Sequence, residues 1–154
     1  MAEAISASDA SRGGVEALSL VIFSGAYDRV HFALAMAAAA RAVDRPATLF
    51  FTMGATRALL AADASGPGWH RLHGDEEGRP ASEADAVRIA RGVAGFEELL
   101  SACVALSATV MVCEMGLRAM GLELAQLRPD VPVVPGGLVT LLTEAPRRGA
   151  LVFV

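Results

Sequence analysis

Lysine is absent from this chain of 154 residues, and all 13 basic residues are arginines. The absence excludes Schiff-base chemistry by a lysine side chain and the lysine-containing phosphate loop of P-loop NTPases. The net charge is −4, and no basic segment is interleaved with aromatic residues. Because phosphate neutralisation dominates nucleic-acid affinity, we expect no nucleic-acid partner.

Cysteines and long apolar runs are also scarce. The two cysteines, Cys103 and Cys113, are too few for a disulfide framework. The longest stretch without a polar residue, Phe32 to Ala40, falls far short of the ~20 residues that cross a bilayer. The first residues are acidic and lack the apolar run of a secretory signal. These absences predict a cytoplasmic protein with no membrane partner.

Apolar residues are abundant, at 54% of the chain, whereas charged residues make up 19%. A small domain with this composition has more apolar surface than its own core can bury, so we expect a homo-oligomer. Residues 1–16 are small and polar and predict a disordered tail. Residues 17–154 are then a single domain.

Strand and helix patterns alternate along that domain. Strands are predicted at 18–23, 47–52, 108–112, 131–134 and 149–154, and helices at 27–43, 53–62, 82–91, 96–106, 114–121 and 138–143. Alternation at this spacing indicates right-handed βαβ units and a parallel sheet. Pro132 favours an edge position for the fourth strand. Ser82 and Asp85 are spaced as a capping-box variant at the start of a helix.

Cys113 lies where the third strand meets the following helix. Ligands and chemistry collect at such junctions in open α/β sheets. The free N–H groups and the positive dipole end of the helix favour thiolate, although Glu114 opposes this if its carboxylate points inward. The alternative is an inert cysteine that fills the core.

The three histidines and Arg118 are further candidates. His70 and His73 lie in the irregular segment 63–80, followed by three acidic residues, and could bind zinc or iron; exposure to solvent is the alternative. His31 could act as a base for the thiol or lie on a helix surface. Arg118 could bind an anionic sulfur species or remain solvated. Hydrolase, dinucleotide and Cys-x-x-Cys motifs do not occur.

Several short segments form a recognisable series along the chain. They are SGAYDRV (24–30), FFTMG (50–54) with Leu59 and Leu60, VCEMGLRAMGL (112–122), Leu124 with Leu127, and VPGG (134–137). In their order and spacing these segments resemble the DsrE/DsrF-like family, which includes TusD-type sulfur-relay proteins. The resemblance covers roughly residues 18–154. Glu114 and Gly116 depart from it, since glutamine and serine are typical there.

The resemblance implies a three-layer α/β/α sandwich on a five-stranded, mainly parallel sheet. It implies a trimer or hexamer with active cysteines near subunit boundaries. It also implies that Cys113 takes up sulfane sulfur as a persulfide from a donor protein and passes it to an acceptor. We expect no cofactor and no metal. The expected pocket comprises Ser24, Gly25, Tyr27, Asp28, His31, Met53, Gly54, Glu114, Met115, Gly116, Arg118, Gly136 and Gly137.

Two other functions remain open from the sequence. The first is a non-catalytic oligomeric module that binds a small ligand or partner, with Cys113 as a packing residue. The second is a metal-binding regulator that uses His70 and His73. Burial of Cys113 separates the carrier from the module. We also expect the segment 63–80 to border the Cys113 pocket with Trp69 as its anchor, and we expect no Cys103–Cys113 disulfide.

Overall fold

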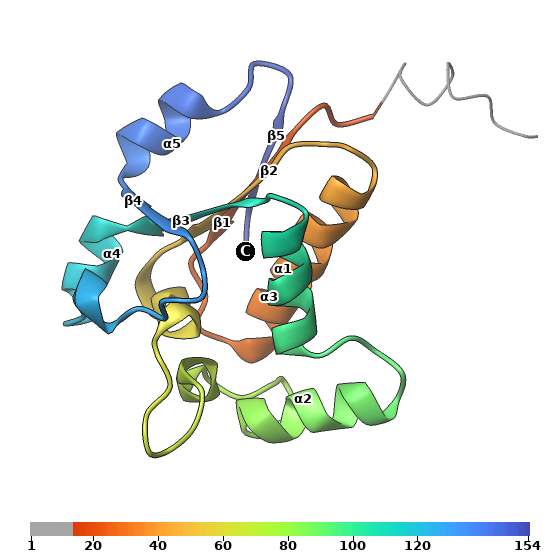
Figure 1. The fold of residues 1–154 in the computed structure, drawn as a ribbon, viewed down its shortest axis with the longest axis vertical. Coiled ribbons are helices and arrows are strands. Elements are labelled where there is room, and N and C mark those ends of the chain that lie inside the picture. Colours follow the sequence, from red (N-terminus) through yellow and green to blue (C-terminus); the bar gives the residue numbers. More distant parts are fainter. Residues whose placement is uncertain (1–13) are drawn as a thin grey trace, which may run out of the picture.

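The computed structural model describes residues 14–154, so most of the predicted tail 1–16 lies outside the described residues. The chain alternates strands and helices as expected (Figure 1). The strands are β1 Leu18–Ile22, β2 Ala47–Phe51, β3 Thr109–Cys113, β4 Val133–Gly136 and β5 Ala150–Phe153. The α-helices are α1 Tyr27–Ala42, α2 Ala81–Ala90, α3 Phe96–Ala105, α4 Glu114–Ala119 and α5 Leu138–Glu144. Short 3-10 helices are η1 Met53–Leu59, η2 Gly68–Arg71 and η3 Leu124–Gln126.

The five strands form one parallel sheet in the order β4-β3-β2-β1-β5. The chain therefore moves outward from β1 to β4 and then returns to the far side of β1. Right-handed connections in opposite directions place their helices on opposite faces. Accordingly α1 and α3 lie on one side of the sheet and α5 on the other, which confirms the predicted three-layer sandwich (Figure 1).

One face of the sheet, here called the covered face, carries most of the core. Successive strand residues point to opposite faces, so Leu20 and Ile22 belong to this face while Val21 belongs to the other. The alanines Ala33 and Ala37 of α1 are fully buried against it. Small side chains there let α1 approach the sheet and α3 closely.

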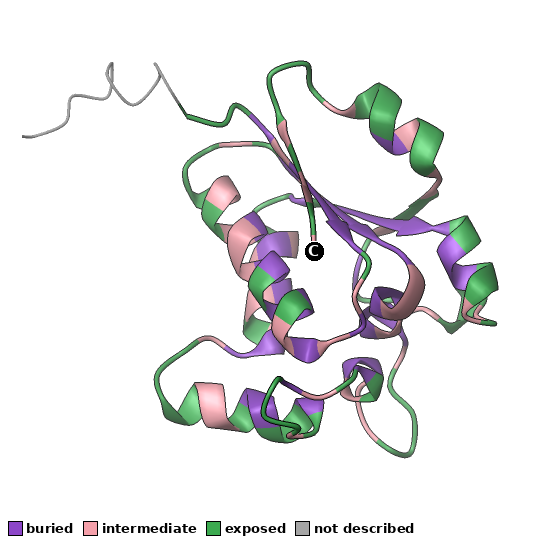
Figure 2. Cartoon of the chain, turned by 180° about the vertical axis from the view of Figure 1, so that it is seen from behind, coloured by how far each residue is buried: buried purple, intermediate pink, exposed green. Residues whose placement is uncertain are grey.

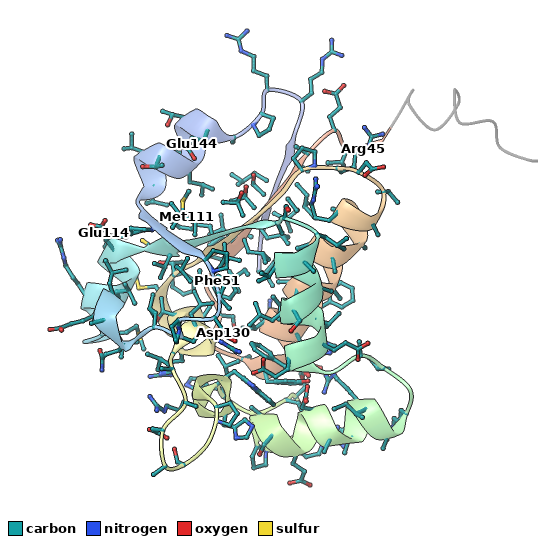
Figure 3. All side chains as sticks on the ribbon, viewed as in Figure 1. Arg45, Phe51, Met111, Glu114, Asp130 and Glu144 are labelled. Atoms are coloured by element: carbon teal, nitrogen blue, oxygen red, sulfur yellow. The ribbon has the colours of Figure 1, made fainter. Side chains whose placement is uncertain are left out.

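The other face, here called the open face, is packed by α5 alone within residues 14–154. Its buried cluster contains only Val21, Phe50, Met111, Cys113 and Leu141. Figure 2 shows the difference: α5 is largely exposed, whereas the inner sides of α1 and α3 are buried. Figure 3 labels Phe51, from the covered face, and Met111, from the open face.

Three local predictions differ from the structure. The helix predicted at 53–62 is the 3-10 helix η1, which ends at Leu59. The fourth strand covers 133–136 rather than 131–134, and Pro135 lies within it. Proline has no backbone N–H to donate to a neighbouring strand. It is tolerated in β4 because this strand lies at the edge of the sheet and has a neighbour on one side only. Helix α2 begins after Pro80 with no side-chain cap, so the predicted capping box with Asp85 is wrong. Asp85 is instead buried and bound elsewhere.

Candidate functional site

Cys113 ends β3 and caps α4. Its backbone pairs with Gly136 at the end of β4. The Gly116 N–H donates a hydrogen bond to Cys113 Sγ across 3.4 Å, so the thiol satisfies one of the free donors of the first helical turn. The strand-to-helix position predicted for Cys113 is therefore confirmed, together with the contact to the helix N–H groups.

Gly116 holds α4 against the end of β2. A Cβ at this position would lie 2.5 Å from Thr52 Oγ1 and 2.6 Å from the Met53 nitrogen, distances that no side chain tolerates. The close approach brings the donor N–H over the thiol. Met53 itself has a φ of 45°, a left-handed conformation that is strained for a methionine. Its carbonyl accepts a hydrogen bond of 2.7 Å from the Thr56 hydroxyl.

The Cys113 side chain is sealed within the monomer, with 1% of its surface exposed. It belongs to the open-face cluster, to which α5 contributes a single buried residue, Leu141. A cavity of about 280 Å³ adjoins α4, lined by Glu114, Leu117, Arg118, Leu122, Glu123 and Leu124. Cys113 is not among the residues that line this cavity, so the cavity gives no access to the thiol.

The first two strand ends meet at two glycines. A Cβ on Gly25 would lie 3.1 Å from the Gly54 backbone, and one on Gly54 would lie 3.0 Å from Gly25. Ser24 is part-buried beside them and accepts a hydrogen bond from the Ala26 N–H through its hydroxyl. Gly137 forms the start of α5, while Met115 is half-exposed on α4. These predicted pocket residues thus follow the rim of the sheet.

Tyr27 and Asp28 lie in a separate cluster under α2. The Tyr27 hydroxyl donates to Asp85 Oδ1 across 2.5 Å, and the Phe96 N–H donates to the same oxygen across 2.7 Å. Burial, followed by the bond to Asp85, raises the pKa of Tyr27 well above its usual range. Arg88 lies over the Tyr27 ring at 4.9 Å and pairs with Asp28. The cluster is packed into the covered face and ties α2 to α1.

His31 is neither a base for Cys113 nor a surface residue. It is buried, and its Nε2 lies 2.8 Å from the Ala94 carbonyl oxygen. Its ring packs beside Tyr27, with 5.5 Å between ring centroids. Helix α1 covers the face opposite Cys113, so both readings of His31 from the sequence are wrong.

The segment 63–80 also packs toward the covered face. Trp69 is buried, stacks on Phe96 at 4.8 Å between centroids, and donates to Glu97 through Nε1. It is thus an apolar anchor as expected, but for α1 and α3 rather than for the Cys113 site. His70 packs edge-on against the Trp69 ring.

His73 lies apart from His70. Its backbone joins the end of β1, where its N–H donates to the Gly25 carbonyl and its carbonyl accepts from the Tyr27 N–H. Its Nε2 is 3.2 Å from Arg57 Nη1. Within residues 14–154, no group of three or more His, Cys, Asp or Glu side chains is arranged to hold a metal ion.

Cys103 lies on the opposite face from Cys113. Its Sγ donates to the Leu34 carbonyl across 3.3 Å, and burial raises the pKa of this thiol to about 11. Both cysteines are free. Cys103 belongs to the covered-face cluster and Cys113 to the open-face cluster. The sheet therefore stands between the two thiols.

Sequence reasoning missed Met111 and Leu141, which share the buried cluster of Cys113, and Thr52, which lies against Gly116. One signal was available: Met111 is two residues before Cys113 on the same strand and therefore shares its face. Thr52 and Leu141 come from other elements. Nothing in the local pattern links them to the cysteine, so their placement follows only from the sheet order.

The chain resembles solved structures in fold. The structure of MTH1491 from Methanobacterium thermoautotrophicum, described as a protein of unknown function, shares 13% identity and a TM-score of 0.57. The alignment covers 89% of this chain and 97% of the MTH1491 chain. The YchN protein of E. coli shares 16% identity and a TM-score of 0.51, with 90% and 99% covered. No family model and no curated protein matches the sequence.

The two likenesses establish the fold alone. YchN has a DsrE-like fold, so the structural similarity agrees with the family resemblance of the sequence at the level of architecture. In residues 14–154, no helix is long and apolar enough to span a membrane.

Proposed function

We propose that the protein is a sulfur carrier that holds sulfane sulfur on Cys113 as a persulfide and passes it to a partner. The observation that carries this proposal is the hydrogen bond from the Gly116 N–H to Cys113 Sγ at the end of a parallel strand. The DsrE-like fold of the YchN neighbour supports it.

The transfer is balanced without a cofactor. Deprotonated Cys113 attacks the outer sulfur of a donor persulfide; the donor S–S bond breaks, a new S–S bond forms on Cys113, and the donor leaves as a thiolate that takes up the proton. Delivery is the reverse step toward an acceptor thiol. Cys103 takes no part, because it lies on the other face and its raised pKa keeps it protonated at neutral pH.

In this proposal, donors reach Cys113 when α5 moves, because Leu141 of α5 shares the buried cluster of the thiol. The helix has seven residues and buries only Leu141 against the sheet. Burying one leucine side chain stabilises a contact by roughly 2 kcal/mol, so opening is thermally accessible. The Gly136–Gly137 pair precedes the helix, and a Cβ on Gly137 would meet no atom within 4 Å. Donors therefore reach the thiol in a minor, open state.

Intact mass spectrometry tests the proposal in a Cys103→Ser background, which leaves a single thiol. Incubation with a polysulfide or thiosulfonate donor should add one sulfur, about 32 Da, and the further Cys113→Ser change should abolish the gain. Leu141→Ala should accelerate labelling several-fold. Leu142→Ala is the matched control, because Leu142 is the neighbouring residue of α5 and is 61% exposed. Equal labelling with and without Cys113 contradicts the proposal.

We also propose that the protein forms a homo-oligomer, a trimer or hexamer, through the open face. Phe153 pairs with Val21 and Leu151 with Ser19, so both point to this face. The Phe23 and Phe153 rings lie 5.5 Å apart on the molecular surface. Uncovered apolar side chains that gather around this face and α5 support burial by a second copy. They are Phe23, Val134, Leu138, Val139, Leu142, Leu151 and Phe153.

The alternative function is a non-catalytic oligomeric module. The near-complete burial of Cys113 favours it, since a sealed thiol packs as a small apolar residue. In that case the donor experiment yields no mass gain in any variant, including Leu141→Ala. The same apolar open face would then serve assembly alone.

A further inference from the structure

An apolar cavity of about 540 Å³ opens at the end of the sheet remote from Cys113. Its walls are Gly14, Val15, Leu18, Met36, Ala40, Val43 and Arg45. Leu18 begins β1 and Arg45 precedes β2, so the cavity lies at the amino ends of the strands. Figure 3 labels Arg45 near the end of α1 and Glu114, the neighbour of Cys113, at the other side of the molecule. The cavity is therefore independent of the proposed sulfur site.

Helix α1 and its C-cap residue, Val43, supply one wall through a single stripe. Met36, Ala40 and Val43 are spaced by four and three residues, which places them on one helical face. Val43 and Val15 are 67% and 48% exposed, so apolar carbon faces water here. The small Ala40 leaves room between the longer side chains. A volume of this size is typical of pockets for small organic molecules.

Among the described residues 14–154, Arg45 is the one charged residue of the cavity wall. Its backbone is fixed by the end of α1: the Arg45 N–H donates to the Ala40 carbonyl, and the Asp44 N–H donates to the Arg41 carbonyl. Asp44 has a φ of 58°, which completes a Schellman motif. Among residues 14–154, the ion pairs do not include Arg45.

We propose that this cavity binds an unbranched carboxylate amphiphile of the medium-chain fatty acid class. The alkyl chain lies along Met36, Ala40 and Val43, and the carboxylate pairs with Arg45. The apolar wall matches an alkyl chain, and Arg45 matches a carboxylate. A neutral alkane would leave Arg45 without an anion, and a small polar anion would leave the apolar wall uncovered. Arginine suits this pairing because its guanidinium offers two parallel donors to a carboxylate.

The test titrates the full chain with octanoate and with 1-octanol, observed through the methionine methyl NMR signals. The chain has six methionines, and a Met36→Leu variant assigns the signal of Met36. Octanoate should shift the Met36 signal. It should leave the signals of Met111 and Met115, which report on the open face and α4, unchanged. Arg45→Gln should weaken octanoate binding about two- to five-fold, in keeping with a partly exposed ion pair, and leave 1-octanol unchanged.

Ala40→Phe and Ala39→Phe form the matched pair that locates the ligand. Ala40 lines the cavity, whereas Ala39 is exposed on the neighbouring helical position. Phenylalanine at 40 should fill the cavity and abolish the shift, while phenylalanine at 39 should leave it intact. The proposal is overturned if millimolar octanoate leaves the Met36 signal unmoved, if it shifts Met115 instead, or if Ala40→Phe binds as tightly as the wild type.

Discussion

The two faces of the sheet differ in how they are buried. The covered face meets α1 and α3. Its cluster includes fully buried aromatic and aliphatic residues from the strands and from both helices. In the described part of the chain, the open face meets only α5, and its cluster keeps five residues buried. One face therefore provides the stability of the monomer, while the other carries the candidate reactive thiol and the surface available for assembly. The proposed chemistry and the proposed association share the face that folding leaves least covered.

Two adjacent residues of β2 give the largest expected difference between the faces. Phe51 points to the covered face and Phe50 to the open face, and both are fully buried. Phe51→Ala should cost about 3–5 kcal/mol of unfolding free energy, because the packed helices cannot fill the cavity. Phe50→Ala should cost less, about 2–3 kcal/mol, since α5 can settle into the space.

Urea unfolding of both variants measures these costs, and alkylation of Cys113 provides a second readout. Phe50→Ala should also raise the alkylation rate, whereas Phe51→Ala should raise it only near its unfolding midpoint. Equal stability losses and equal alkylation rates would show that the two faces are packed alike.

A charge on the open face should disrupt assembly. Phe153→Asp places a carboxylate among apolar residues, and burying it at an interface is costly. We expect the protein concentration at which half of the chains are assembled to rise at least tenfold, which corresponds to a loss of about 1.4 kcal/mol in association free energy. Light scattering should then approach the 15.9 kDa mass of one chain. Ile89→Asp is the control, because Ile89 is 56% exposed on α2, away from this face. A wild type that is already monomeric at micromolar concentration refutes the assembly proposal.

The buried hydroxyl of Tyr27 should make the covered face sensitive to alkaline pH. Its pKa is raised in the folded state, so the stability it contributes is full below the unfolded pKa of about 10 and is lost as pH rises further. Tyr27→Phe removes the bond to Asp85 and should cost about 1 kcal/mol at pH 7. The variant should lose less stability than the wild type between pH 9 and about 11.5.

Denaturant unfolding across that pH range measures the effect. The absence of lysine helps, because few other groups titrate there; Cys103, with its pKa near 11, contributes equally in both proteins. Parallel stability profiles for the two proteins would contradict the role of the Tyr27 hydroxyl.

The smallest expected effect lies at the end of α1. Asp44 adopts a φ of 58°, where glycine carries no penalty from a side chain. Asp44→Gly should therefore stabilise the monomer by about 0.5 kcal/mol. A melting temperature that falls instead would show that the Asp44 side chain makes a favourable contact in solution.

The sequence predicted the parallel sheet and the position of Cys113 because both follow from local patterns. Alternating strands and helices determine the connections, and a strand-to-helix junction determines where a residue at that junction lies. It did not predict on which face of the sheet Tyr27, Asp28 and His31 lie. These residues follow β1 closely, yet α1 carries them to the covered face. Face assignment depends on the direction of each crossover, and that becomes known only with the strand order.

The return of the chain from β4 to β5 has a consequence for folding order. Strands β1 to β4 each pair with the next strand along the chain, but β1 also pairs Leu18 with Ala150, across most of the chain. Closing so long a loop is entropically costly and slow. During synthesis, one edge of β1 stays unpaired while the covered face already forms. Nascent chains should therefore pass through a stage with an open strand edge beside Phe23, when chaperone binding or pairing between chains competes with the arrival of β5.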